Sequence, residues 1–465
     1  MPAHRPATDR DAGRGASELA RQGPGVIPRP ERETGLRILL LGATGLIGSA
    51  IAARLSAGGH EVTGVTRAVD AAARRLPVAR WIEADLRRMT TPEAWRPILN
   101  GIDAVVNCAG ALQDSARDST AGVHRDAPAA LWTASEQAGV SRVIHFSAMG
   151  VERGALTPFS RSKLAGDEAL AGTGLDWVIL RPSVVVGRQA YGGSALFRGL
   201  AALPILPKTP DAGPLAIVQL EDVVETVVRL LPPGSSPRIA LDLAGPEQLS
   251  FEEVVQAYRA WLGWRPARVV RTPGWLMAFV YRLGDLVAKF GWRPPIRSTA
   301  RREIVRGAVG DPSEWIRLTG IQPRPLDAAL AAEPASVQER WFARLYLLKP
   351  VAIGTFALFW LLTGLISLGP GYGLAASYMY SADAGPLSEP SVIAGGLADI
   401  VIGLGILFRR TSRLALIAAL LVSVFYVVAG SLLLPALWRD PLGPMMKIWP
   451  ILAFNLLCLA ILDER

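Results

Sequence analysis

The stretch from Pro350 to Ala382 contains no charged residue, and this feature constrains the fold more than any other. A helix over residues 347–368 rises about 1.5 Å per residue, which is enough to cross a hydrocarbon core of about 30 Å. Inside lipid, a single segment satisfies its backbone N–H and C=O groups only as a helix. We therefore expect an all-α membrane domain over residues 345–465.

Three further apolar segments follow the first. We expect them to span the membrane over residues 392–408, 414–437 and 445–462. The second segment contains Asp399, and an ionised carboxylate is costly there unless it is paired, protonated or hydrated. Asp399 is therefore a candidate functional residue of the membrane domain. The alternative is a protonated acid that holds the helices together through a hydrogen bond to Tyr426 or Asn455.

The basic residues that flank the predicted spans indicate an orientation. One end of the spans carries Arg344, Lys349, Arg409, Arg410, Arg413 and the last residue, Arg465. The loop over residues 369–390 has neither lysine nor arginine, whereas Arg439 and Lys447 count in the opposite direction. Because basic residues are enriched in cytoplasmic loops, we expect both termini in the cytoplasm of a bacterium and the protein in its inner membrane.

The preceding part of the chain, residues 37–334, has the pattern of a soluble α/β domain. Short β-branched runs alternate with longer amphipathic stretches, which is typical of βαβ units around a doubly wound parallel sheet. We expect a smaller substrate-side subdomain over about residues 183–334. Residues 1–36 are rich in Arg, Pro, Gly and Ala, so we expect a disordered extension there, or a translation start assigned too far upstream.

The composition argues against several classes of function. The formal net charge is +9, but 44 of the 49 basic residues are arginines, and acidic residues alternate with them. There is no basic stripe with interleaved aromatic residues of the kind that binds nucleic acid. The two cysteines, Cys108 and Cys458, are far apart in the sequence, and the four histidines are not clustered. We therefore expect no nucleic-acid partner, no disulfide framework and no metal site.

A strand followed by a glycine-rich turn marks the start of the α/β domain. The run Arg37–Leu41 leads into a Gly-x-x-Gly-x-x-Gly turn and then into a segment with helical periodicity. The first glycine permits the tight turn, the second lets the backbone approach a pyrophosphate, and the third lets helix and strand pack closely. The N-terminus of the helix then faces the anion. We expect a dinucleotide to contact Gly42, Thr44, Gly45, Leu46, Ile47 and Gly48.

Arg67 bears on the choice between the two nicotinamide dinucleotides. It ends the predicted second strand, Glu61–Arg67, where the adenosine ribose is expected. An acidic residue there would favour NAD, whereas an arginine can pair with the 2′-phosphate of NADP. We therefore expect NADP to be preferred to NAD. The alternative is that Arg67 is a solvated residue in an arginine-rich chain.

Further motifs make a family resemblance specific. They are the glycine turn, Asp85-Leu86, Asn107-Cys-Ala-Gly110, Ser147, and Lys163 sixteen positions later. With these motifs the chain resembles the extended and atypical short-chain dehydrogenase/reductase superfamily. The resemblance implies that Asn107, Ala109 and Gly110 line the cofactor cleft. It also implies that Asp85, followed by Leu86, contacts the adenine.

A second group of motifs lies beyond residue 180. It comprises Arg181-Pro182-Ser183, Leu220-Glu-Asp222, Leu243-Ala-Gly-Pro-Glu247 and a capping box over residues 250–253. These motifs resemble the subgroup that contains the NADPH-binding accessory subunit of respiratory complex I. The resemblance covers about residues 37–332 and adds Pro182 to the residues expected near the cofactor.

The catalytic position of that superfamily is altered in this sequence. Its members use a serine that orients the substrate, a tyrosine that exchanges a proton with the substrate oxygen, and a lysine that lowers the tyrosine pKa and holds the nicotinamide ribose. The corresponding residues are Ser147, Phe159 and Lys163. Because phenylalanine has no proton to give, the sequence predicts cofactor binding and leaves the enzyme activity open. Tyr191 is an alternative proton donor from another loop.

The membrane segments also carry family patterns. Residues 438–450, which lead into the last span, read W-R-D-P-L-G-P-M-M-K-I-W-P, and the second span contains Gly395-Gly-Leu-Ala-Asp399. These patterns resemble the four-helix DoxX-like membrane family, which is associated with membrane redox chemistry. The resemblance implies an atypical dehydrogenase domain fused to a DoxX-like domain.

One amphipathic stretch, Trp275 to Phe290, has two interpretations. One face carries Leu276, Phe279, Val280, Leu283, Val287 and Phe290, and another carries Arg282, Asp285 and Lys289. The stretch either packs as core over the substrate cleft or lies on the bilayer as an interfacial helix.

Together these features predict a membrane-anchored protein that binds NADP or NAD. As an oxidoreductase it would act on an apolar or quinone-like membrane substrate, with Ser147 orienting that substrate and Lys163 holding the ribose. The alternative, which Phe159 favours, is a non-catalytic NADPH-binding redox sensor or an assembly subunit in an oligomer or membrane complex. A third interpretation is a transporter-like bundle regulated by the nucleotide, with Asp399 on its path.

Overall fold

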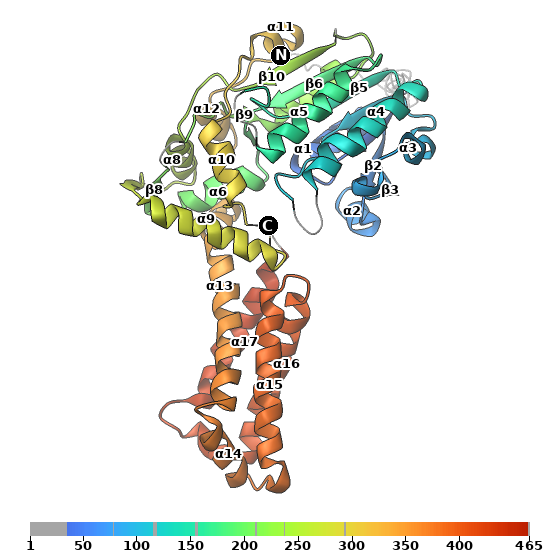
Figure 1. Cartoon of the computed structure of the whole chain (residues 1–465). Coiled ribbons are helices and arrows are strands. Elements are labelled where there is room, and N and C mark those ends of the chain that lie inside the picture. Colours follow the sequence, from blue (N-terminus) through green and yellow to red (C-terminus); the bar gives the residue numbers. More distant parts are fainter. Residues whose placement is uncertain are drawn as a thin grey trace, which may run out of the picture.

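The computed structural model describes residues 35–463 except 78, 115–118, 154–156, 210–211, 237 and 293. The predicted disordered extension over residues 1–36 therefore lies almost entirely outside the described residues, as does Arg465. The described chain forms an α/β domain from which a long helical bundle extends (Figure 1). This arrangement confirms the predicted fold class, a Rossmann fold followed by an all-α domain with four long apolar helices.

A parallel sheet of seven strands forms the centre of the α/β domain, in the order β10-β6-β5-β4-β1-β2-β3. The strands are β1 (Arg37–Leu41), β2 (Glu61–Thr66), β3 (Arg80–Glu83), β4 (Ala104–Asn107), β5 (Arg142–Phe146), β6 (Trp177–Pro182) and β10 (Ile239–Leu243). The chain order reverses between β1 and β4. Ligands of such sheets bind at this switch point, beyond the carboxyl ends of the strands.

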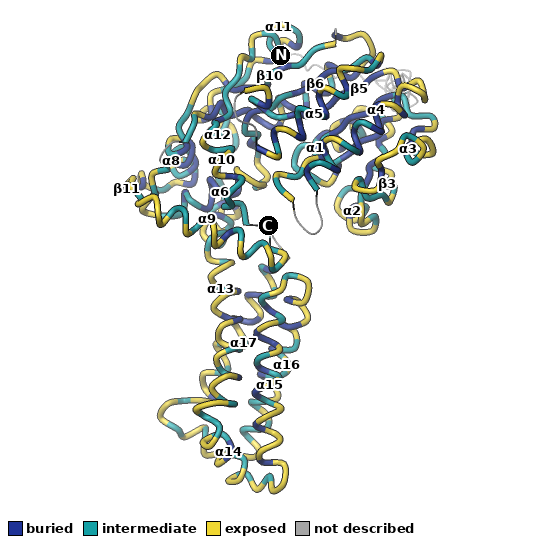
Figure 2. Tube along the Cα trace, viewed as in Figure 1, coloured by how far each residue is buried: buried dark blue, intermediate teal, exposed yellow. Residues whose placement is uncertain are grey.

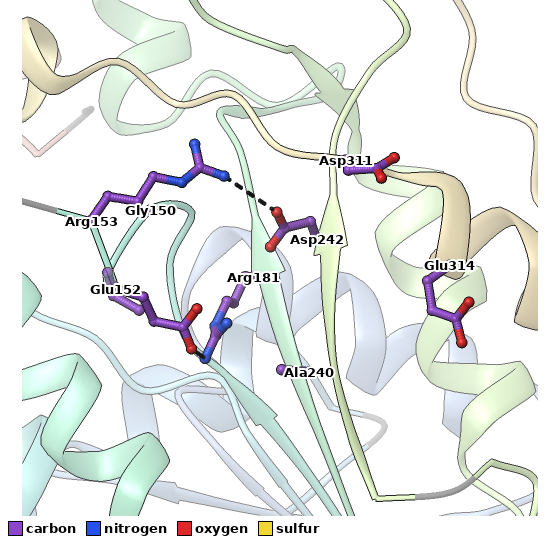
Figure 3. Close-up of a pocket in the computed structure, with 9 residues that line it drawn as sticks. Gly150, Glu152, Arg153, Arg181, Ala240, Asp242, Asp311 and Glu314 are labelled. Carbon is purple, nitrogen blue, oxygen red and sulfur yellow. Dashed lines mark ion pairs between the residues drawn. The ribbon is translucent and has the colours of Figure 1, made fainter.

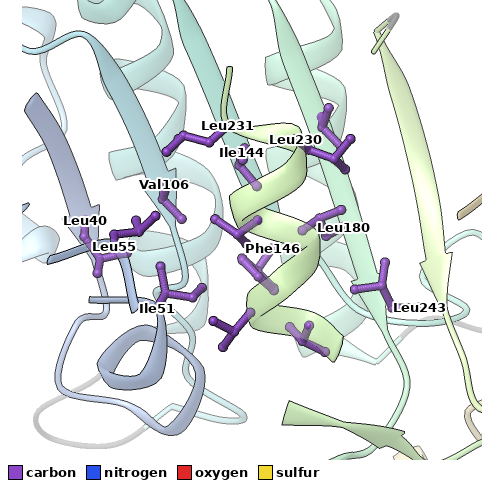
Figure 4. Close-up of a cluster of buried hydrophobic side chains, with 14 of the residues drawn as sticks. Leu40, Ile51, Leu55, Val106, Ile144, Phe146, Leu180, Leu230, Leu231 and Leu243 are labelled. Atoms are coloured by element: carbon purple, nitrogen blue, oxygen red, sulfur yellow. The ribbon is translucent and has the colours of Figure 1, made fainter. Parts of the chain in front are cut away.

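Helices cover both faces of the sheet. They are α1 (Leu46–Ala57) and α7 (Leu220–Leu230) on one face, and α3 (Pro92–Leu99), α4 (Ala127–Gln137) and α5 (Pro158–Ala171) on the other. Figure 4 shows Ile51 and Leu55 of α1 packed near Leu40 and Val106 of the sheet. Strands buried on both faces need a continuous hydrophobic run, which explains the sequence of β1. Burial of this kind holds the glycine turn after β1 in place.

The chain after β6 builds a second, smaller layer. Its main elements are α6 (Gly192–Ala201), β8 (Ile205–Lys208), α8 (Phe251–Trp261), β11 (Arg268–Arg271), α9 (Gly274–Lys289), α10 (Ser298–Arg306) and α12 (Leu326–Ala332). Helix α11 (Ser313–Thr319) packs on the main sheet instead, where Trp315 is part of the core. Aromatic rings of Phe197, Phe251 and Tyr258 meet in its core. The predicted capping box is confirmed, because Ser250 Oγ accepts from the Glu253 N–H and Glu253 Oε2 accepts from the Ser250 N–H.

Among the residues that the structure describes, the bundle contains four helices that are long and apolar enough to cross a membrane. They are α13 (Val337–Leu368), α15 (Ser388–Leu407), α16 (Ser412–Leu433) and α17 (Pro444–Ile461), with α14 (Tyr372–Ser381) at the end far from the sheet. At most 33% of the apolar window of each helix is buried inside the protein. Most apolar side chains therefore face outward, as Figure 2 shows for the bundle, which is the arrangement that lipid requires.

Three of the four helices differ from the predicted spans by at least about four residues at one end. The helix of the second span begins at Ser388, before the predicted residue 392. The helix of the first span begins at Val337, because it continues without a break from the α/β domain into the bundle. The third helix ends at Leu433 because Pro435 begins a short 3₁₀ turn over Pro435–Trp438. Proline lacks the N–H that would continue the helical hydrogen bonds from the preceding turn.

Candidate functional site

The glycine turn after β1 forms the floor of the candidate nucleotide site. Gly42 has a φ of +74°, and a Cβ on it would lie 2.6 Å from the carbonyl oxygen of Cys108. A Cβ on Gly48 would lie 2.3 Å from the carbonyl oxygen of Gly42. Gly45 is the N-cap of α1, whose N-terminus has neither a side-chain cap nor an acidic residue in its first turn. This geometry fits a pyrophosphate at the N-terminus of the helix.

The other predicted contacts of the turn lie beside these glycines. Thr44 is exposed within the turn, and Leu46 and Ile47 are the first two residues of α1. Their positions at the N-terminus of α1 are those expected of residues that line a bound dinucleotide. The structure thus brings the six predicted turn residues together at the carboxyl end of β1.

The predicted adenosine end carries more positive charge than the sequence analysis recognised. Asp85 accepts hydrogen bonds from the backbone N–H and from the guanidinium group of Arg87. The hydrogen bond from the guanidinium group lowers the pKa of the Asp85 carboxyl group. Arg67 also lowers the pKa of Asp85 through its charge. Leu86 begins a 3₁₀ turn, η2 (Leu86–Arg88), immediately after Asp85. Two guanidinium groups, those of Arg67 and Arg87, therefore act on one carboxylate here.

A chain of buried polar groups connects the ends of β4 and β5. Asn107 Oδ1 accepts from the Ala109 N–H at 3.0 Å, and Asn107 Nδ2 lies 3.2 Å from His145 Nδ1. His145 Nε2 lies 3.4 Å from Asp167 Oδ1, and Ser147 Oγ donates to Asp167 Oδ2 at 2.8 Å. Burial lowers the pKa of His145, whereas hydrogen bonds from its partners lower the pKa of Asp167 against its own burial. Asp167 is therefore an ionised acceptor within this chain.

Lys163 lies at the centre of the site. Its side chain is 4% exposed, and its Nζ donates to the carbonyl oxygens of Phe146 at 2.7 Å and Ala109 at 3.2 Å. Burial lowers the pKa of Lys163 to about 8. An ammonium group has three N–H bonds, so one of them remains for a ligand once these two carbonyls are satisfied. Because Gly110 has no side chain, the backbone leaves space next to this nitrogen, where a Cβ would lie 3.9 Å from Nζ.

Phe159 packs edge-on against His124, a residue that the sequence analysis did not identify. The two ring centroids are 5.4 Å apart. His124 Nε2 accepts from the Ala111 N–H at 2.9 Å, which places the proton on Nδ1, 2.8 Å from Ser162 Oγ. Burial lowers the pKa of His124 to about 2, so the ring is neutral. Its single proton is already used, and neither Phe159 nor His124 can supply the proton of the missing tyrosine.

The remaining predicted residues lie around this centre. Pro182 ends β6, next to the carboxyl end of β5. Tyr191 is the N-cap of α6 in the smaller layer and is 39% exposed. Helix α10 closes over the N-terminus of α5, where Glu303 accepts from Thr157 and Ser160, and Arg306 donates to Ser160. Polar contacts thus join α10 to the N-terminus of α5, on either side of Phe159 in the sequence.

A cavity of about 250 Å³ lies beside the candidate site, at β6 and β10. Figure 3 shows its charged lining, with ion pairs from Arg181 to Glu152 and from Arg153 to Asp242. Arg181 also contacts Asp167 Oδ2 at 3.3 Å, so it lies between the cavity and the hydroxyl of Ser147. Charged walls favour water or a polar ligand, so this cavity does not suit an apolar substrate.

In the bundle, Asp399 is 3% exposed and accepts a hydrogen bond from Tyr426 Oη at 3.0 Å. Asn455, the other predicted partner, donates instead to the carbonyl oxygen of Leu416 at 3.1 Å. Tyr426 is therefore the partner of Asp399, and the hydrogen bond joins α15 to α16. This contact fits the interpretation in which the acid holds two helices together.

Comparison with known proteins identifies both parts of the chain. A model of the family described as NAD(P)H-binding matches residues 42–199, and a model of the DoxX-like family matches residues 357–456. The chain is an NAD(P)H-binding domain followed by a DoxX-like domain. The predicted combination of a nicotinamide-dinucleotide-binding domain with a DoxX-like domain is thereby confirmed. The DoxX-like match and the four apolar helices identify a membrane protein.

Several curated proteins are related to the NAD(P)H-binding part. An uncharacterized protein of Mycobacterium tuberculosis is 28% identical over 227 residues, which are 48% of this chain but only 23% of that relative. The ceramide reductase of Caulobacter vibrioides is 23% identical and the photosystem II assembly factor Ycf39 of Synechocystis is 26% identical. These two matches cover 51% and 53% of this chain, and 73% of each relative.

Solved structures share the fold of the α/β domain. The crystal structure of the Bordetella bronchiseptica enzyme WbmG in complex with NAD superposes with a TM-score of 0.50 at 19% identity. The match covers 65% of this chain and 95% of the other. At this sequence identity the similarity shows a shared fold and no more.

Proposed function

We propose that the protein is a membrane-anchored NAD(P)H-dependent oxidoreductase that acts on an apolar or quinone-like membrane substrate, with an NAD(P)H-binding domain over residues 37–334 and a membrane domain over 345–465. The observation that carries this proposal is the buried ammonium group of Lys163, held by the carbonyls of Phe146 and Ala109 at the carboxyl ends of β4 and β5. Burying an ammonium group costs free energy, so its presence at this position indicates a function. A ribose hydroxyl at its remaining N–H would supply that function.

The proposed mechanism assigns a role to each group around Lys163. When bound, the nicotinamide supplies or accepts a hydride. Gly110 leaves room for the cofactor, and Asn107 fixes the backbone of Ala109 next to it. Ser147 would orient the substrate oxygen after its hydroxyl turns away from Asp167, whose charge Arg181 then balances. Water would supply the proton.

We further propose that NADP is preferred to NAD. The support is the local charge, because Arg67 and Arg87 both act on Asp85 at the end of β2 and β3. A 2′-phosphate carries the charge that such a pair of guanidinium groups binds well. NAD, which has a ribose hydroxyl at that position, would gain less from them.

The apolar substrate class is supported by the membrane domain and by one relative. The four apolar helices hold the NAD(P)H-binding domain at a lipid surface, where an apolar substrate is concentrated. The Caulobacter vibrioides relative is named as a reductase of ceramide, which is a lipid. The charged cavity at Arg181 would then serve polar ligands or water and not the apolar part of a substrate.

A second candidate function is a non-catalytic NADPH-binding sensor or assembly subunit. Two observations favour it: Phe159 has no proton to donate, and the proton of His124 is directed to Ser162. Neither side chain can therefore donate a proton to a substrate oxygen. The proton of Ser147 is also directed to Asp167. The Synechocystis relative is named as an assembly factor, which is consistent with this alternative.

We propose that the NAD(P)H-binding domain and both termini face the cytoplasm, across a bacterial inner membrane. The support is the distribution of basic residues, since Arg409, Arg410 and Arg413 lie in or next to the connection between α15 and α16, which contacts Phe290 at the end of α9. Asp463 pairs with Arg409 and Arg413 and reduces this charge. A fluorescent protein that folds only in the cytoplasm should fluoresce when fused after residue 465, and a dark fusion would contradict this orientation.

The experiment that separates enzyme from sensor uses detergent-solubilised protein loaded with NADPH. A lipid extract from the native membranes is added, and nicotinamide absorbance is followed over many turnovers. Lys163→Ala should abolish oxidation if the protein is an enzyme, whereas Arg74→Ala, which removes an exposed cation on helix α2 (Val69–Arg75), should not. Tight NADPH binding with no turnover in the wild type would instead support the sensor or assembly function.

A further inference from the structure

Helix α9 lies crosswise at the end of the bundle, between the α/β domain and the four apolar helices (Figure 1). Several of its large apolar side chains are exposed, although Tyr281 is buried. The exposed side chains include Trp275, Leu276, Phe279, Leu283 and Leu286, with Trp275 73% and Phe279 58% exposed. These residues recur every three or four positions and form one face of the helix. The interpretation of this stretch as core packing over the substrate cleft is therefore wrong for Leu276, Phe279 and Leu283.

The opposite face of α9 packs against the protein. A Cβ on Gly284 would lie 1.9 Å from the carbonyl oxygen of Ile296, so the segment before α10 touches the helix backbone there. Asp285 pairs with Arg297 and accepts from Ser298, both at the start of α10. Helix α10 lies on the sheet side of α9 in Figure 1. The exposed apolar face is thus turned away from the sheet, toward the side from which the bundle extends.

Direct contacts fix the height of α9 at the end of the membrane helices. The Arg409 N–H, just after α15, donates to the carbonyl oxygen of Phe290 at 3.0 Å. Trp292 Nε1 donates to the carbonyl oxygen of Leu407 at 2.7 Å, and the rings of Phe290 and Phe408 have centroids 5.2 Å apart. The C-terminal end of α9 therefore sits where α15 leaves the membrane.

Exposed apolar side chains are also present on the neighbouring strand pair. Ile205 of β8 and Val270 of β11 lie on the same side of this pair and are exposed, and β11 joins α9 through a short turn. Basic side chains border this surface: Arg268, Arg271, Arg282, Lys289 and Arg410 are all exposed. The one acid of α9, Asp285, is on the packed face. Apolar side chains bordered by arginine and lysine match the boundary between lipid tails and anionic headgroups.

We propose that α9 and β11 form a second membrane contact of this protein, an interfacial surface that lies on an anionic lipid bilayer beside the four spans. The apolar face of α9 enters the headgroup boundary, and the bordering arginines and lysine bind lipid phosphates. This proposal concerns the lipid contact alone and holds for an enzyme and for a sensor. The competing interpretation is that a second copy of the chain covers the surface of α9 and β11.

The test places a spin label on the full chain in lipid nanodiscs. Labels go on Phe279→Cys or Leu283→Cys, with Thr133→Cys on α4 as an exposed control distant from the bundle. Cys108 and Cys458 are replaced by alanine beforehand, and retained NADPH binding shows that this background is folded. Collisions of each label with dissolved oxygen and with a water-soluble nickel complex are measured in phosphatidylcholine discs and in discs that also contain phosphatidylglycerol.

The lipid contact predicts several-fold fewer nickel collisions and more oxygen collisions at residues 279 and 283 than at residue 133. The difference should grow with phosphatidylglycerol, and the double substitution Arg268→Glu with Arg271→Glu should remove that growth. Equal nickel accessibility at 279 and 133 in both lipids would overturn the proposal. Dipolar broadening between labels at 279 would also overturn it, because it would show that a second copy covers the face.

Discussion

Gly42 should be essential for both the stability of the NAD(P)H-binding domain and its affinity for NADPH. In Gly42→Ala the new Cβ would lie 2.6 Å from the Cys108 carbonyl oxygen and 2.7 Å from the Ala109 nitrogen, and both neighbours are backbone atoms that cannot rotate away. The positive φ of +74° adds about 1–2 kcal/mol. Forced overpacking adds about 1–3 kcal/mol, so we expect a total loss of about 2–5 kcal/mol.

The variant Gly139→Ala is the matched control. Gly139 has a φ of +72°, but a Cβ there would meet nothing within 4 Å. It should therefore lose only about 1–2 kcal/mol from the backbone conformation, with unchanged NADPH affinity. In Gly42→Ala the turn must separate from the end of β4, and if the overpacking energy opposes binding, the Kd for NADPH rises about 5- to 150-fold.

Two measurements on detergent-solubilised protein check this reasoning. Denaturant unfolding without nucleotide gives the stability of wild type and both variants, and a fluorescence titration gives the NADPH affinity. Equal stability losses in Gly42→Ala and Gly139→Ala, together with wild-type NADPH affinity in both, would refute this role of Gly42. That result would mean that the turn at Gly42 neither packs against β4 as described nor touches the cofactor.

Four further predictions concern ionisable side chains. Burial lowers the pKa of Lys163 from 10.5 to about 8, so the unfolded chain binds more protons than the folded chain between these pH values. As the pH rises through that window, the wild type should therefore gain stability relative to Lys163→Met, by on the order of 3 kcal/mol. Thermal unfolding of both proteins across this pH range checks the prediction. Arg67→Asp should weaken NADPH relative to NADH at least about tenfold in a binding titration; an unchanged ratio would contradict the proposed 2′-phosphate contact. Tyr426→Phe should destabilise the bundle by about 0.5–1.5 kcal/mol in unfolding assays, whereas Asp399→Asn should leave NADPH affinity at the wild-type value.

The fold could be predicted from local sequence patterns because they coincide with local physical needs. The hydrophobic run of β1, the glycines that follow it and the uncharged segment after Pro350 each specify a structure without long-range information. The limits of the helices could not be predicted as well. Whether α13 begins near Leu347 or at Val337 depends on packing against α6, which the sequence of α13 alone does not contain.

The site was only partly predictable for a related reason. Ser147 and Lys163 follow a known spacing, and Asp167 lies one helical turn after Lys163, so its place on the same face of α5 was a usable signal. The pairing of Asp167 with His145 depends on how β5 and α5 meet in the fold. His124 had no comparable signal, because it lies in a short π-helical turn, η3 (Gly122–Asp126), before α4.

The helix α9 shows a different limit. Periodicity correctly placed Phe279 and Leu283 on one face, but it cannot tell whether that face meets protein or lipid. In the structure the missing side chain of Gly284 lets the opposite face approach the backbone at Ile296, and the face with Phe279 and Leu283 is exposed. The clue available in the sequence was Gly284, a residue without a side chain among large apolar residues.

Helix α13 has a consequence for how the length of this chain can vary. It runs unbroken from Val337 to Leu368, and its first part packs so closely on α6 that a Cβ on Gly199 would overlap the ring of Tyr346. Each residue added between Tyr346 and the bundle would turn one half of the molecule by about 100° relative to the other and raise it by about 1.5 Å. A change of seven residues, close to two full turns, restores the angle but shifts the height by about 10 Å. The number of residues in this helix therefore sets both the rotation and the separation of the two domains, and neither can change without the other.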